Sequence, residues 1–103
     1  MKAIIDGRRY NTTTADEILE WDNGRGGSDW KWRVKTLYRT PKGSWFIHHK
    51  GGPMTDCARA IGNMSDAGQY IEPVSDDDAF AFLTSHDGAP EAEAHFADRI
   101  ADA

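Results

Sequence analysis

The sequence predicts an α+β fold: an antiparallel β meander of about four or five strands with one or two C-terminal helices packed on one face. Two observations carry this prediction. Over residues 30–39, a set rich in Trp, Val and Tyr alternates with a set rich in Lys and Arg, which is typical of an antiparallel strand. The clearest helix-start signals, Ser75 and Pro90, come late in the chain. A length of 103 residues is enough for one domain, 1–103, with a modest core.

The N-terminal residues predict a short hairpin. Asp6-Gly7 separates two short runs, and Asp-Gly is a favoured two-residue turn because both central residues tolerate positive φ. Beyond it, Thr14 and Glu17 fit a capping box, so residues 14–21 are compatible with a short helix. The apolar residues of this segment fit a strand equally well, and both interpretations stay open. The three glycines within residues 23–28 predict a loop.

Residues 30–50 predict the central hairpin of the sheet, with a turn at Pro41-Lys42-Gly43. The first strand places Trp30, Trp32, Val34, Thr36 and Tyr38 on one face, and Lys31, Arg33, Lys35, Leu37 and Arg39 on the other. The return strand places Trp45, Ile47 and His49 opposite Phe46, His48 and Lys50. We expect the Trp/Val/Tyr face to be buried and the Lys/Arg face to be exposed.

The C-terminal part predicts the helices. Residues 54–68 show no clear pattern beyond a short helical turn at 57–61, and Tyr70-Ile71 predicts a brief strand before Pro73. Ser75 is a good N-cap with acids in the first turn behind it, and Asp87-Gly88 ends that helix. Pro90 fits the first position of a last helix. The apolar residues of this last helix recur every four positions: Ala92, Phe96 and Ile100.

Charge is divided unevenly along the chain. Residues 30–55 contain six bases and no acid, whereas residues 61–103 contain ten acids and one base. Residues 1–60 therefore carry +4 and the remainder −9, for a net charge of −5. A small domain with separate basic and acidic faces favours a binding protein over an enzyme.

Catalytic and metal-binding signatures are weak. The single Cys57 excludes an internal disulfide and lacks a neighbouring base, so we interpret it as a core residue. His48 and His49 are adjacent on a strand and point to opposite faces, so they cannot chelate one ion together. We expect no cofactor, no metal and no enzymatic activity. The chain starts without a signal peptide and has no apolar run of membrane length, which predicts a soluble cytoplasmic protein.

Two charged surfaces are the candidate partner-binding sites. The first is acidic: Asp76, Asp77, Asp78, Asp87 and Glu91. The second is the basic hairpin face, where Lys and Arg side chains suit phosphate groups: Lys31, Arg33, Lys35, Arg39, His48 and Lys50. The alternative for both is an ordinary solvated surface.

Four segments together resemble a family of small, largely uncharacterised bacterial proteins often found on phage and other mobile elements. The segments are Ile4-Ile5-Asp6-Gly7-Arg8-Arg9-Tyr10-Asn11-Thr12, Thr36-Leu37-Tyr38-Arg39-Thr40 through Gly43-Ser44-Trp45-Phe46, Gly51-Gly52-Pro53-Met54, and Pro73-Val74-Ser75. The resemblance covers roughly residues 4–86, and its motifs are structural. Relatives are expected to carry an acid near position 50, where this chain has Lys50.

The resemblance implies a setting in which small acidic proteins block host defence, anti-CRISPR proteins among them, and this implication is an association of size, charge and setting. We therefore expect a non-enzymatic inhibitor that binds a host protein or nucleoprotein complex, such as a CRISPR effector, and no membrane. The alternative is a small regulatory protein that binds nucleic acid through the basic hairpin.

Overall fold

The computed structural model describes residues 1–26 and 28–103 and has the predicted α+β architecture. Its strands are β1 (Lys2–Ile5), β2 (Arg8–Asn11), β3 (Asp16–Asp22), β4 (Arg33–Arg39), β5 (Trp45–Gly51), β6 (Arg59–Ile61), β7 (Met64–Asp66) and β8 (Gly68–Val74). Its helices are α1 (Asp76–Ser85), α2 (Ala89–Phe96) and the 3₁₀ helix η1 (Ala97–Arg99). Within the described ranges, no helix is long and apolar enough to cross a membrane.

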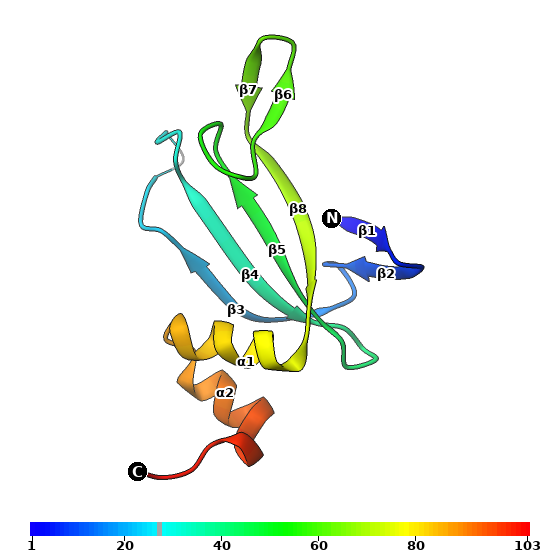
Figure 1. Cartoon of the computed structure of the whole chain (residues 1–103), viewed down its shortest axis with the longest axis vertical. Helices are drawn as coiled ribbons and strands as arrows, with labels where there is room; N and C mark the ends of the chain where they lie inside the picture. Colours follow the sequence, from blue (N-terminus) through cyan, green and yellow to red (C-terminus); the bar gives the residue numbers. More distant parts are fainter. Residues whose placement is uncertain (27) are drawn as a thin grey trace.

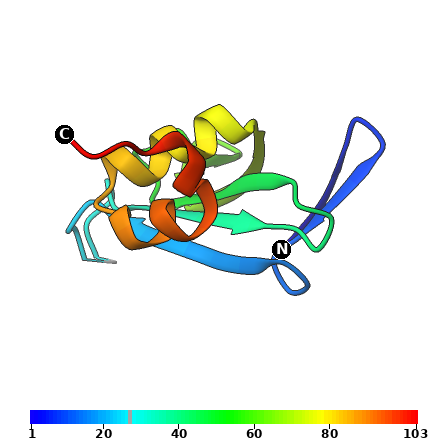
Figure 2. The same ribbon diagram turned by 90° about the horizontal axis from the view of Figure 1, so that it is seen from below.

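The centre of the fold is a four-stranded antiparallel sheet in the order β3-β4-β5-β8. The helices lie over one end of this sheet, and the β6–β7 hairpin projects from the opposite end (Figure 1). The β1–β2 hairpin stands to the side of the sheet (Figure 2). Residues 14–21, compatible with either helix or strand by sequence, belong mainly to strand β3, which pairs with β4 through a register shift between Glu17 and Leu19.

The predicted N-terminal hairpin is present as β1 and β2. Asp6 and Gly7 both have positive φ, 52° and 76°, as a tight two-residue turn requires. Tyr10 on β2 then packs edge-on against Phe46 of the sheet, with ring centroids 5.6 Å apart. Tyr10, Phe46 and Ile71 form a small core on the face of the sheet to which the Phe46 side chain points.

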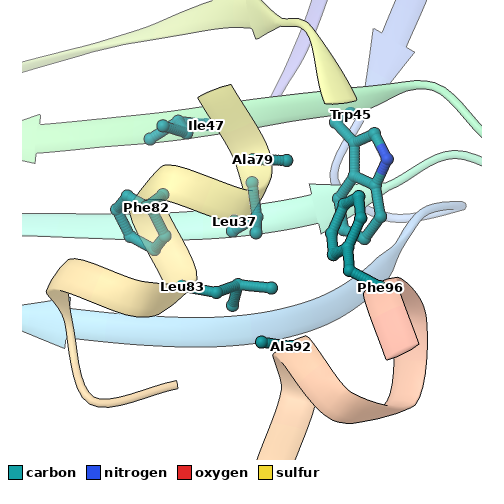
Figure 3. Close-up of a cluster of buried hydrophobic side chains, with 8 residues drawn as sticks. All are labelled: Leu37, Trp45, Ile47, Ala79, Phe82, Leu83, Ala92 and Phe96. Atoms are coloured by element: carbon teal, nitrogen blue, oxygen red, sulfur yellow. The ribbon is translucent and has the colours of Figure 1, made fainter. Parts of the chain in front are cut away.

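The larger core lies between the other face of the sheet and the helices (Figure 3). It consists of eight buried residues from β4, β5, α1 and α2: Leu37, Trp45, Ile47, Ala79, Phe82, Leu83, Ala92 and Phe96. Leu37 and Ile47 are cross-strand partners, so they present one apolar surface to the helices. We call this face of the sheet the helix face.

The predicted assignment of buried and exposed faces on the first hairpin strand is wrong in two respects. Leu37, which shares its face with the Lys and Arg side chains, is completely buried under the helices. Trp30, expected in the core, is 66% exposed, because β4 begins only at Arg33 and the two tryptophans precede it. Strand alternation indicates which residues share a face, but the helices decide which face becomes the core.

The C-terminal half departs from expectation at three places. Residues 57–61 form no helical turn, because the chain instead builds the short β6–β7 hairpin, all of whose residues are exposed. The strand at Tyr70 continues through Pro73, which an edge strand tolerates because one side of it is unpaired. Ile100 follows η1 and is 42% exposed, so it does not join Ala92 and Phe96 in the core.

The two predicted helix starts are confirmed. The Ser75 hydroxyl accepts a hydrogen bond from the backbone N–H of Asp78 at 3.1 Å, and three acids occupy the first turn of α1. Pro90 lies in the first turn of α2. The Asp87-Gly88 break between the helices is also present, with Asp87 at φ 60°.

Candidate binding surfaces

The first turn of α1 presents three exposed carboxylates on a rigid support. Asp76, Asp77 and Asp78 are all exposed, while the helix behind them buries Ala79, Phe82 and Leu83 against the sheet. The Ser75 cap satisfies one free N–H of the helix start, and the positive end of the helix dipole favours the acids. The capped and packed helix therefore holds the backbone of these acids in place, and their side chains point into solvent.

Arg99 lies among these acids. Its guanidinium donates a hydrogen bond to Asp77 and lies over the Phe96 ring, 5.4 Å from the ring centroid. Its pKa is raised by that hydrogen bond, with smaller contributions from the charges of Asp77, Asp76 and Asp98. Three carboxylates thus surround one cation, which leaves the cluster with a net negative charge. We call Asp76, Asp77, Asp78 and Asp98 the acidic cluster.

The sequence-predicted acidic site is not one surface. Asp87 lies beyond the other end of α1, about 15 Å from the first turn at a rise of 1.5 Å per residue. Glu91 is half-buried in α2, and its Oε2 atom is buried without a hydrogen-bond partner among the described residues. Asp98, which sequence reasoning did not select, joins the cluster because its neighbour Arg99 on η1 reaches Asp77 on α1. Only its position in the acidic C-terminal region pointed to it.

The basic hairpin residues are split between the two faces of the sheet. Lys31 precedes β4, whereas Arg33, Lys35 and Arg39 lie on the helix face, where Lys35 is the cross-strand partner of His49. His48 and Lys50 point to the opposite face. One flat ligand cannot contact both sets.

Several of these basic groups interact within the protein. The Arg33 side chain is only 11% exposed, and its Nε and Nη2 atoms donate to the two carboxylate oxygens of Asp56 at 2.8 and 3.0 Å. The Arg39 guanidinium lies over the Trp45 ring at 5.2 Å, and the Lys35 ammonium lies over Trp21 at 5.5 Å. These contacts stabilise the protein's own fold and compete with binding of phosphate.

Arg33 belongs to a polar network on the helix face, beyond the helices. It donates to His49 Nδ1 at 2.7 Å, and His49 Nε2 lies 2.8 Å from a Glu72 oxygen. Because Nδ1 accepts, Nε2 carries the ring proton and donates to Glu72. The Tyr70 hydroxyl donates to Asp56 at 2.9 Å, and its ring stacks on His49 at 4.4 Å. We call Arg33, His49, Asp56, Tyr70 and Glu72 the polar network.

The pKa values in the polar network follow from these contacts. The hydrogen bonds from Arg33 lower the pKa of Asp56 to about 2, and burial followed by the bond to Asp56 raises the pKa of Tyr70 to about 12. Burial lowers the pKa of His49, partly opposed by its bond to Glu72. His49 uses both ring nitrogens on internal partners, so it offers no free base. The network secures the loop of Asp56 against the sheet.

Cys57 is buried beside this network, and burial raises the pKa of its thiol. A reactive cysteine requires the opposite, a lowered pKa and access to solvent, so the environment of Cys57 suits a core residue. Within residues 1–26 and 28–103, no group of three or more His, Cys, Asp or Glu side chains is arranged to hold a metal ion.

Comparison with protein-family models, curated proteins and solved structures gives no match to this chain. Its function is therefore inferred from the surfaces described above.

Proposed function

We propose that this protein is a non-enzymatic inhibitor of a host-defence nucleoprotein complex, of the anti-CRISPR type, and that it binds its target through the acidic cluster. The observation that supports this proposal is the presentation of three exposed acids on the first turn of a packed helix, with Asp76, Asp77 and Asp98 all close to Arg99. Such an arrangement suits a basic groove that normally holds nucleic acid.

Rigidity favours this surface because ordering a flexible acidic tail on binding offsets much of the gained interaction energy. Here α1 is already fixed by its Ser75 cap and by the burial of Phe82 and Leu83. Negative charge also steers association with a basic partner and excludes acidic ones. The basic hairpin supports binding less well, because its residues are divided between two faces and Arg33 is engaged by Asp56.

The test uses purified, guide-loaded CRISPR effector complexes of several types, with target-DNA binding measured by gel shift. We expect the wild-type protein to block DNA binding by at least one complex. Asp76→Asn with Asp78→Asn should weaken that inhibition about tenfold or more, which corresponds to about 1.4 kcal/mol of binding free energy. Asp77 is left unchanged because it bonds to Arg99.

A matched control removes the same charge elsewhere. Glu17→Gln with Glu20→Gln neutralises two exposed acids on β3 and should change inhibition less than twofold. Both variants are first checked for folding by circular dichroism, since each lost acid in the α1 turn costs about 0.3–1 kcal/mol of helix-dipole interaction. Equal effects of the two double variants contradict the acidic cluster as the site. Loss of inhibition on Lys31→Gln with Lys35→Gln instead favours the basic hairpin.

A further inference from the structure

A second charged surface lies between two turns and has no part in the proposed acidic contact. The β1–β2 turn and the β4–β5 turn extend toward the same side of the molecule in both views (Figures 1 and 2). A groove of about 690 Å³ lies between them. Its wall includes Arg8, Arg9 and Lys42, together with Tyr10, Thr40 and Ser44.

The charge of this groove is uncompensated. Three cations line it and no acid does; Asp6, the only acid within residues 1–15, is not part of the wall. None of the ion pairs found among residues 1–26 and 28–103 involves Arg8, Arg9 or Lys42. In contrast, Arg33 and Arg99 both have carboxylate partners. Like charges held together without a counter-charge repel one another. An anion bound in the groove therefore reduces the electrostatic repulsion among the three cations.

Both walls of the groove are fixed in place. Tyr10 is buried against Phe46, which anchors β2 to the sheet and leaves Arg8 and Arg9 exposed. Across the groove, the backbone N–H of Ser44 donates to the Thr40 hydroxyl oxygen at 3.0 Å. Because that oxygen accepts this bond, the Thr40 hydroxyl proton stays available for a ligand.

The composition of the groove matches phosphate. Guanidinium groups bind phosphate oxygens through a planar fork, a lysine adds a point charge, and hydroxyl groups donate further hydrogen bonds. The same residue types make the contacts that position proteins on nucleic-acid backbones. The one aromatic residue in the wall, Tyr10, is buried against the core and unsuited to stacking on a base. We propose that this groove binds the phosphodiester backbone of a nucleic-acid strand without reading its sequence.

This inference is independent of the acidic cluster. If both hold, the protein contacts the protein part of a nucleoprotein complex with α1 and its nucleic acid with the groove. The site differs from the basic hairpin face, with which it shares no residue.

The test measures fluorescence anisotropy of labelled 20-nucleotide single-stranded DNA of two unrelated sequences, titrated with the protein at 50 and 200 mM NaCl. We expect equal affinity for both sequences. Two to three phosphate contacts predict a slope of log K against log salt of about −1.4 to −2.1. Arg8→Gln with Lys42→Gln should reduce the slope by about 1.4 and weaken binding at 50 mM NaCl at least tenfold.

Two controls separate the outcomes. Lys31→Gln with Lys35→Gln removes the same charge from the hairpin and should change DNA binding less than threefold. Asp76→Asn with Asp78→Asn should retain binding, so failure of the acidic cluster and failure of the groove are distinguishable. The inference is overturned by an absence of DNA binding at 50 mM NaCl, by unchanged binding of Arg8→Gln with Lys42→Gln, or by an equal loss in the hairpin variant. Complete displacement of the DNA by 10 mM inorganic phosphate at constant ionic strength also overturns it, because the site then takes a single phosphate and not a strand.

Discussion

The two ends of the helix face are built from the same strands in different ways. Under α1 and α2 the sheet presents Leu37, Trp45 and Ile47, and the contacts are apolar. Toward the start of β4 and the end of β5, the same face presents Lys35, Arg33 and His49. There Arg33 and His49 make hydrogen bonds and ion pairs. The side chains on this face change from apolar to charged and polar where the helices end.

The polar end is covered by a loop in place of a helix. Gly51 on β5 and Gly68 on β8 are cross-strand partners, and a side chain at either position would collide with residues 55–57. Their lack of a side chain lets this loop approach the sheet closely and places Asp56 beside Arg33. One sheet face can therefore be covered either by apolar side chains of helices or by a loop that joins it through a connected polar network.

The largest effect should come from the apolar end. Leu37→Ala leaves a cavity under the helices and should lower the free energy of unfolding by about 2–5 kcal/mol, measured by urea denaturation. Ile4→Ala is the control, since Ile4 is 70% exposed and its truncation should cost no more than about 0.5 kcal/mol. Similar costs for the two variants are incompatible with the helices covering the Leu37 face.

A smaller effect should come from the polar end. Arg33→Met keeps the length of the side chain but removes the donors to Asp56 and His49, and should cost about 1–3 kcal/mol. The expectation from the sequence, an exposed basic face, instead implies a negligible cost. Lys31→Met is the control for a truly exposed basic residue. Because Lys31 is exposed, this substitution should change the free energy of unfolding by no more than about 0.5 kcal/mol. If Arg33→Met matches Lys31→Met in urea melts, the polar network does not stabilise the loop.

The smallest effect concerns pH. Burial lowers the pKa of His49 in the folded protein below its ordinary value of 6.5, so the unfolded chain binds more protons as pH falls. The free energy of unfolding should therefore decrease as pH falls below about 6.5, until the folded-state pKa is reached. His48 shifts in the same direction, again because of burial.

Urea melts at pH 7.5 and 5.5 test this directly. His49→Gln should show a smaller difference between the two pH values than the wild-type protein does. The Leu37→Ala variant should keep the wild-type difference, since no titrating group is removed at the apolar end. An unchanged pH dependence in His49→Gln would place the acid sensitivity outside the polar network.

Local signals in the sequence predicted the elements well. The Asp6-Gly7 turn, the Ser75 cap and the alternation on β4 and β5 each act over a few neighbouring residues, and each is present in the structure. The β6–β7 hairpin was not predicted, because its short exposed strands carry no apolar periodicity. The candidate acidic residues on α1 could be selected from the sequence, but the contribution of Asp98 could not.

By itself, the sequence determined the fold class, the helix starts and which side chains share a face on β4 and β5, because these depend on backbone sterics and short-range hydrogen bonds. Tertiary structure alone decided that the Leu37 face is the core, that Arg33 meets Asp56 from 23 residues away, and that Arg8 and Lys42 line one groove. These features join segments distant in the chain. The free energy of the first two comes from burial and charge pairing across the fold, and no local pattern in the sequence indicates any of the three.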